Sequence, residues 1–300
     1  MKKQSYIGSG AFADCVGLRS FRMPATLRFV ADYLFSCCRS LENVELPQTI
    51  SYIGVNAFFN CEKLQKIQLP DALTHIGAAA FLRCRSLEEL SIPTSVTEIG
   101  KRAFAYCPSL RRVALHASIP AVEDETFNSC FALESIELPD SVRRVGERAF
   151  YRCRSLSSVR LPRGLARMEE YAFASCLSLT EISLPDNMEL IEPHCFDACG
   201  SLKTVLLPDG RVRIGRAVFA GCEKLSLIVV SDARPVLGHT LDRWGVPADT
   251  AVVWHSELRL SLREASLSEQ TLSDEERADE ERNIAAERAL MLRRHRRLHK

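Results

Sequence analysis

The sequence predicts a repeat solenoid, a right-handed stack of coils with parallel β-strands and short helical turns, followed by a C-terminal α-helix. Phenylalanine recurs at every twenty-third position in ten copies without a slip, cysteine follows each one three positions later, and leucine six positions later. The phenylalanine column is Phe12, Phe35, Phe58, Phe81, Phe104, Phe127, Phe150, Phe173, Phe196 and Phe219. The cysteine column is Cys15, Cys38, Cys61, Cys84, Cys107, Cys130, Cys153, Cys176, Cys199 and Cys222. Chance does not produce such spacing.

Each copy supplies the elements of one coil, as residues 53–75 (IGVNAFFNCEKLQKIQLPDALTH) show. Leu64, Ile67 and Leu69 predict a short strand closed by a proline. The spacing of alanine, phenylalanine and cysteine predicts one or two helical turns with these side chains on one side. One copy is too short to bury these apolar side chains alone, so neighbouring coils must stack into a continuous core.

A second short extended segment precedes the glycine of the repeat, as Val96 and Ile99 do before Gly100. A glycine at this place predicts a turn with positive φ. Three copies carry Glu123, Glu169 and Glu192 instead, which argues against a positive φ in every copy.

The repeats predict a solenoid over residues 1–255, with a degenerate C-terminal cap at about 232–255. Continuing the repeat spacing from Ile228 and Val230 leads to Ala251 and Val253, which predicts an eleventh strand with these two residues facing inward. Trp244 or Trp254 is expected to plug the open end of the core.

Residues 256–300 form a charged tail in which Ser273 and Glu276 make a capping box. A helix is therefore expected over about 274–297. The outward strand positions become apolar only near the end of the stack, at Leu206, Leu227 and Val229, and we expect residues 256–272 to fold back over them.

The composition excludes several classes of protein. The 39 basic and 38 acidic residues nearly cancel, so nucleic acid is an unlikely main partner. No stretch of about 18 apolar residues occurs and the amino terminus has no apolar signal region, so membrane insertion is not expected. The sequence as written predicts a cytoplasmic protein, or a cell-surface one if the amino terminus is truncated.

The cysteines and histidines predict no chemistry. We expect the ten ladder cysteines to be buried and reduced, because parallel inward side chains stay too far apart for disulfides and a straight column does not converge on a metal. His194 beside Cys195 is the only histidine–cysteine neighbour, and adjacent side chains on a turn point apart. The sequence therefore predicts a protein that is not an enzyme, with no cofactor, metal or small-molecule substrate.

The repeat closely resembles the BspA-like (treponemal-type) leucine-rich repeat family. The likeness is carried by the A-F-x-x-C-x-x-L core and the proline that follows, as in Ala80, Phe81, Cys84, Leu87 and Ile92-Pro93. It covers roughly residues 6–231. The resemblance implies a leucine-rich-repeat stack and a recognition protein, often on the surface of a host-associated microbe.

The strand positions that point away from the core predict a binding surface, together with an arginine-rich group in the middle of the chain. The candidate residues are Arg112, Glu137, Arg144, Arg148, Arg160 and Arg167. Acidic residues among these arginines favour a solvated face. The leading hypothesis is a non-catalytic protein-interaction scaffold. The alternatives are a fragment of a surface adhesin and nucleic-acid binding through the basic tail at 293–300.

Overall fold

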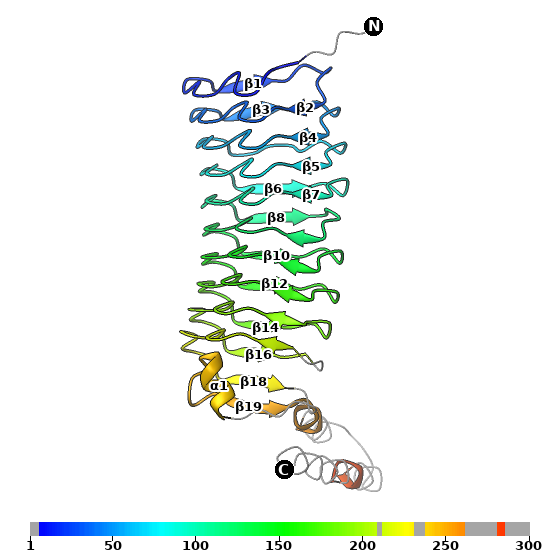
Figure 1. Cartoon of the computed structure of the whole chain (residues 1–300), viewed down its shortest axis with the longest axis vertical. Helices are drawn as coiled ribbons and strands as arrows, with labels where there is room; N and C mark the ends of the chain where they lie inside the picture. Colours follow the sequence, from blue (N-terminus) through cyan, green and yellow to red (C-terminus); the bar gives the residue numbers. More distant parts are fainter. Residues whose placement is uncertain (1–5, 209–211, 231–237, 262–280, 286–300) are drawn as a thin grey trace, which may run out of the picture.

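The computed structural model describes residues 6–208, 212–230, 238–261 and 281–285. It is an elongated stack of coils, each coil lying directly on the one before (Figure 1). Every strand pairing is parallel, which is the arrangement that the repeat requires when each copy makes one full turn. The predicted solenoid is thus the observed fold.

One series of strands runs along the middle of the stack in Figure 1. These strands are β1 (Ser20–Arg22), β3 (Asn43–Glu45), β6 (Glu89–Ile92), β8 (Arg112–Leu115), β10 (Ser135–Glu137), β12 (Ser158–Arg160), β14 (Glu181–Ser183), β16 (Thr204–Leu206), β18 (Leu227–Val230) and β19 (Ala251–Trp254). Partners up to β18 occupy the same position in successive repeats, as Ile136 and Val159 do in β10 and β12. In three-residue strands such as β3 and β10 the central residue faces the core and its two neighbours face solvent.

A second series of two-residue strands follows the first in each coil. It comprises β2 (Phe29–Val30), β4 (Tyr52–Ile53), β5 (His75–Ile76), β7 (Glu98–Ile99), β9 (Ala121–Val122), β11 (Arg144–Val145), β13 (Arg167–Met168), β15 (Leu190–Ile191) and β17 (Arg213–Ile214). The ladder breaks between β7 and β9. Pro120 lies just before β9 and has no N–H, so it cannot make the bond that Thr97 donates to Thr74 one coil earlier.

The first series is interrupted at the coil that contains Ile67, which has no strand. The expected strand over 64–69 was therefore wrong for this copy. Ile67 and Leu69 still point inward, with 8% and 7% of their surfaces exposed. In this coil the apolar side chains therefore still pack inward although the backbone forms no strand.

The segment around each phenylalanine is a chain of tight turns rather than the expected helical turns. In one coil the N–H groups of Ala57, Phe59 and Cys61 bond to carbonyls three positions back, while those of Asn56 and Phe58 bond to the next coil. The residues two before and two after each phenylalanine have positive φ, and eighteen of these twenty are not glycine. These two left-handed residues, four positions apart in each repeat, stop helical propagation and turn alternate N–H groups toward the neighbouring coil.

The repeat glycine serves a different purpose from the expected one. Gly54, Gly77 and Gly100 have no positive φ. A Cβ on Gly77 would lie 2.7 Å from the backbone carbon of Gly54 on the preceding coil, and one on Gly100 would lie 2.5 Å from the Ala78 nitrogen. Glycine is needed there because two backbones pass too closely for a side chain.

The phenylalanines stack into one column whose ring centroids are 5.0 to 5.9 Å apart, with planes within 16° of parallel. From Phe35 to Phe219 the rings are at most 1% exposed. Phe12, in the first coil, is only half-buried because no described coil lies on its outer side. The column is the continuous core that a single coil could not form.

The carboxyl end is closed by the helix α1 (Gly238–Trp244) and by β19, which pairs with β18. Trp244 is 2% exposed, and its carbonyl accepts the N–H of Phe219 at 2.8 Å, the place that the next coil would take. The expected register of the last strand was wrong by one residue. Ile228 pairs with Val252 rather than Ala251, because the chain that includes α1 makes this coil longer than the regular repeat by a single residue.

The apolar residues near the end of the stack are covered. Val229 is 1% exposed, and Leu206 and Leu227 are half-buried. Residues 255–261 are helical, with Leu260 at 3% exposure and His255 Nε2 at 3.2 Å from the carbonyl of Leu207. The rest of the predicted cover, 262–272, lies outside the described residues, so its fold-back stays a prediction.

Most of the predicted tail helix also lies outside the described residues. Residues 281–285 are helical, and Ile284 is 3% exposed. The division of the chain at residue 255 stays a prediction for the same reason.

Candidate binding surface

The cysteine column is a structural ladder held by hydrogen bonds to the backbone. Each thiol from Cys38 to Cys222 donates to the carbonyl of the phenylalanine 26 residues earlier, at 3.0 to 3.3 Å. Burial raises the pKa of the ladder thiols from Cys38 to Cys199, to about 11 for Cys38 and about 12 for Cys130. Such thiols stay protonated at neutral pH and act as small core side chains.

Two parts of the expectation for the cysteines have different outcomes. All twelve cysteines lie in the described part of the chain and all are free, which includes the ten ladder members that were expected to be unpaired. The expectation that all ten ladder members are buried was wrong for Cys15, which is exposed. Cys15 lies in the first described coil, and within the described residues no preceding coil covers it or offers a phenylalanine carbonyl to its thiol.

The histidine–cysteine neighbours do not form a nucleophilic pair. Burial raises the pKa of the Cys195 thiol, while His194 stacks on Tyr171 with the ring centroids 4.9 Å apart. Within the residues that the structure describes, no group of three or more histidine, cysteine or acidic side chains could hold a metal ion. Nor is any described helix long and apolar enough to cross a membrane.

The six residues singled out in the sequence lie on two different strand series. Arg112, Glu137 and Arg160 belong to β8, β10 and β12, whereas Arg144 and Arg167 belong to β11 and β13. Arg148 lies in the turn after β11. The structure therefore does not bring the six onto one surface.

Of the exposed strand arginines among these six, two are paired along the stack, whereas Arg167 of β13 is exposed and has no ion pair among the described residues. Arg112 forms an ion pair with Glu89, and Arg160 with Glu137, each with the equivalent residue of the preceding repeat. Arg148 pairs with Glu147, and its guanidinium carbon lies 5.0 Å from the centre of the Tyr171 ring. A binding role for these residues stays a prediction of the sequence.

Arg144 was expected on a solvated face, which was wrong. Its side chain is 28% exposed and contacts Glu123 at 2.6 Å, Glu169 at 3.3 Å and Asp124 at 3.5 Å. Burial alone would lower the pKa of Arg144, but the hydrogen bond to Glu123 and the three carboxylates raise it overall. Lys101 contacts Asp124 at 2.7 Å, so five charged groups form one network across neighbouring coils.

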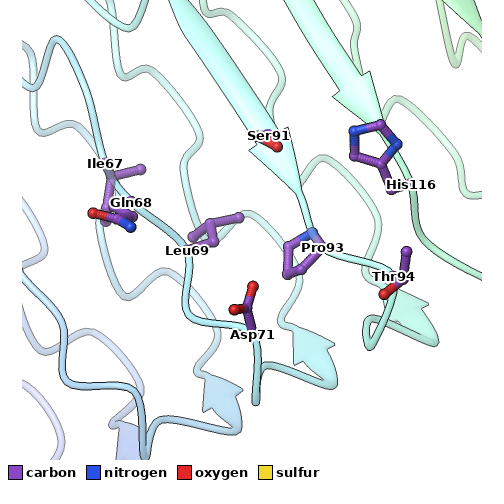
Figure 2. Close-up of a pocket in the computed structure, with 8 residues that line it drawn as sticks. All are labelled: Ile67, Gln68, Leu69, Asp71, Ser91, Pro93, Thr94 and His116. Carbon is purple, nitrogen blue, oxygen red and sulfur yellow. The ribbon is translucent and has the colours of Figure 1, made fainter.

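A groove of about 410 Å³ opens where the first strand series is interrupted (Figure 2). Its apolar floor is Ile67, Leu69 and Pro93, and its polar groups are Gln68, Asp71, Ser91, Thr94 and His116. His116 takes the position that proline holds in eight of the ten repeats, directly after β8. The groove offers hydrogen-bonding groups but no aromatic anchor larger than one imidazole.

The edge formed by the turns carries a surface of different chemistry, on the side of the stack that α1 extends in Figure 1. We call it the arginine–aromatic surface, and it consists of Arg83, Arg85, Tyr106, Pro108, Ser129, Phe131, Arg152 and Arg154. The first six line a depression of about 340 Å³. Tyr106 and Phe131 are 46% and 37% exposed, which is unusual for side chains of their size.

Two arginines of this surface, Arg152 and Arg154, contact aromatic rings rather than carboxylates. Arg154 lies 5.0 Å from the centre of the Phe131 ring and Arg152 5.0 Å from that of Tyr151, but none of the four arginines has an ion pair within the described residues. Glu62, on the coil before Arg85, instead lies 3.8 Å from Arg39. The surface is therefore cationic and partly aromatic at once.

Sequence reasoning reached only part of this surface: Arg152 and Arg154 belong to the arginine-rich group in the middle of the chain, which was expected to be a solvated face, but Arg83, Arg85 and the aromatic residues were not connected with them. The signal was present: positions one to five after Phe81, Phe104, Phe127 and Phe150 contain four arginines, two tyrosines and a phenylalanine but no acidic residue. Reading the turn columns as carefully as the strand columns would have found it.

The match to known repeats decides the family. The BspA type leucine rich repeat region, described in six copies, matches residues 5–133 and 120–238, more than half of the chain. The chain belongs to the BspA-type leucine-rich repeat family. None of the curated proteins compared with the chain matches it.

Solved leucine-rich repeat proteins from bacteria are similar to this chain. One from Bacteroides ovatus is 26% identical, with a TM-score of 0.44, over 83% of this chain and 86% of the other. The leucine-rich repeat protein of T. pallidum is 24% identical, with a TM-score of 0.40, over 82% and 79%. A leucine rich cell surface protein from Faecalibacterium prausnitzii is 21% identical, with a TM-score of 0.41, over 81% and 86%.

Proposed function

We propose that this BspA-type repeat protein is a non-catalytic scaffold that recognises another protein through its arginine–aromatic surface. The observation that carries the proposal is the placement, around exposed Tyr106 and Phe131, of four arginines that have no carboxylate partner among the described residues. Tyrosine and arginine are among the residues most enriched at the positions that dominate protein–protein binding energy.

The lack of carboxylate partners for the arginines of this surface also supports binding to a partner protein. Some of the exposed arginines elsewhere on the stack, namely Arg22, Arg102 and Arg112, pair with a glutamate one coil away. Within the described part of the chain, the four arginines of the turn edge lack such partners although the edge repeats with the same spacing. An aromatic, cationic depression on a rigid stack suits a partner that supplies carboxylates and an apolar side chain.

A site-specific photo-cross-link tests the proposal. A photoreactive benzoylphenylalanine replaces Tyr106 in one version of the chain and Tyr52 in a control version, and both are irradiated in the cells that express the protein. Tyr52 is a suitable control because it is 38% exposed and lies on β4, away from the turn edge. We expect a protein adduct at position 106 and none at position 52. Equal adducts at both positions, or none at 106, would contradict the proposal.

A further inference from the structure

The spacing of charge on the arginine–aromatic surface restricts what can bind there. Arg83 and Arg85 belong to the fourth repeat, and Arg152 and Arg154 to the seventh. Three rungs of a parallel stack span roughly 14 Å, since neighbouring strands lie about 4.8 Å apart. The surface therefore has a cationic pair at each end.

The centre of the surface is apolar. Tyr106 and Phe131 lie on the fifth and sixth repeats, between the two arginine pairs, and line the depression of about 340 Å³ together with Pro108. An apolar side chain can enter this depression while charged groups on either side reach the arginines. The order along the stack axis is thus cationic, apolar, cationic.

We propose that the occupant is an extended acidic segment of a partner protein, with two acidic clusters about four residues apart and an apolar residue between them. An extended chain rises about 3.3 Å per residue, so about four residues span the distance between the arginine pairs. Guanidinium groups bind carboxylates through paired, charge-assisted hydrogen bonds, and the rings of Tyr106 and Phe131 contact the apolar residue. This inference rests on the proposed function, and it names the class of partner.

Charge favours a peptide over nucleic acid at this place. Only four arginines line the surface, whereas nucleic-acid binding generally relies on a longer basic stripe that follows the phosphates. Beyond the seventh repeat the same turn column continues with the exposed apolar residue Leu177 rather than with another cation. The cationic area is therefore short and bounded.

Fluorescence anisotropy with labelled peptides tests the inference on the full chain. The probe is the peptide Glu-Glu-Phe-Gly-Glu-Glu, and the controls carry glutamine in place of every glutamate or serine in place of the phenylalanine. We expect the probe to bind at least about tenfold more tightly than either control, because the interactions at both the ends and the centre contribute. Its affinity should fall as salt is added.

Variants of the chain locate the binding. Each of the double variants Arg83→Gln with Arg85→Gln and Arg152→Gln with Arg154→Gln should weaken binding of the probe by at least about tenfold. The matched control, Arg112→Gln with Arg160→Gln, removes two arginines that already pair with glutamates and should bind normally. Circular dichroism verifies that all three variants keep the fold.

The outcomes separate the two proposals. Equal binding of the probe by all three variants, or tighter binding of a single-stranded oligothymidylate than of the peptide, would overturn the acidic-segment inference. A protein adduct at position 106 together with no peptide binding would overturn only the class of partner. Peptide binding without any adduct would instead count against the proposed function.

Discussion

The strand arginines and the turn-edge arginines lie on neighbouring coils and differ in what their guanidinium groups contact. Arg112 and Arg160 pair with the glutamates at the equivalent position of the preceding repeat, whereas Arg154 has an aromatic ring at that position. In this stack the residue one rung away is the one at the same place in the adjacent repeat. The residue 23 positions earlier in the sequence therefore indicates whether an arginine is neutralised by the adjacent coil or remains available to a partner.

The largest difference in stability is expected between variants of two phenylalanines, one of which faces the core and the other solvent. Phe104 is fully buried in the column, so Phe104→Ala should lower the free energy of unfolding by about 3–5 kcal/mol. Phe131 is 37% exposed on the turn edge, and Phe131→Ser should leave it almost unchanged. Urea denaturation measures both variants. Equal losses would mean that the turn edge is part of the core.

A smaller loss is expected at Arg144, which connects three carboxylates and is 28% exposed. Arg144→Ala should lower the free energy of unfolding by about 1–3 kcal/mol, between the values typical of exposed and of buried ion pairs. Glu123, Asp124 and Glu169 would then repel one another. A variant as stable as the parent protein in urea would show that the network adds nothing.

Acidification tests the same network through Asp124. Burial alone would raise the pKa of Asp124, but the hydrogen bond and charge of Lys101, the backbone N–H of Glu147 and the charge of Arg144 lower it overall. Because the folded-state pKa lies below the unfolded value of about 3.9, this stabilisation is present above about pH 4 and is lost as the pH falls further. Urea midpoints from pH 7 to pH 3 should fall less steeply for Asp124→Asn. Identical slopes would contradict the assignment.

The smallest effect is expected at the exposed strand pair. Arg112 is 69% exposed, and solvent screens its interaction with Glu89. Arg112→Ala should leave the thermal midpoint unchanged within the error of a denaturation curve. A clear drop would mean that exposed pairs along the stack stabilise the fold, and it would weaken the distinction between Arg112 and Arg144.

The sequence predicted the parts of the fold that repeat. The columns of phenylalanine and cysteine predicted the coil length, the parallel register between equivalent positions and the continuous core, because stacking forces equivalent residues onto one another. The hydrogen bonds from the thiols to the phenylalanine carbonyls were missed, since they depend on backbone direction rather than on composition.

The features that the sequence did not predict are those that depend on backbone geometry rather than on residue type. The left-handed residues around each phenylalanine include Tyr106, Glu125 and Arg148, so no residue type marks the position. The repeat glycine was identified but its reason was not, because close approach to another coil is invisible in one repeat. The register of β19 differs by one residue from the expected one because the segment between β18 and β19, which includes α1, makes this coil one residue longer than the repeat. A fixed repeat length cannot predict such an insertion.

Most of the candidate surface was missed for a related reason. The strand columns were read as the recognition face, and their arginines are those that the stack neutralises. The turn columns contributed their inward phenylalanine and cysteine and, in the middle of the chain, an arginine-rich group that was expected to be a solvated face. Outward positions of the same turns hold Tyr106, Phe131 and the four arginines of the arginine–aromatic surface.

The most direct test of this distinction measures stability and binding on the same two variants. Arg144→Ala and Arg154→Ala are each examined by urea denaturation and by anisotropy with the acidic peptide Glu-Glu-Phe-Gly-Glu-Glu. Arg154→Ala should keep the unfolding curve and lose about tenfold in affinity, whereas Arg144→Ala should lose stability and keep its affinity. If Arg144→Ala weakens peptide binding as much as Arg154→Ala does, the division between structural and recognition arginines is wrong.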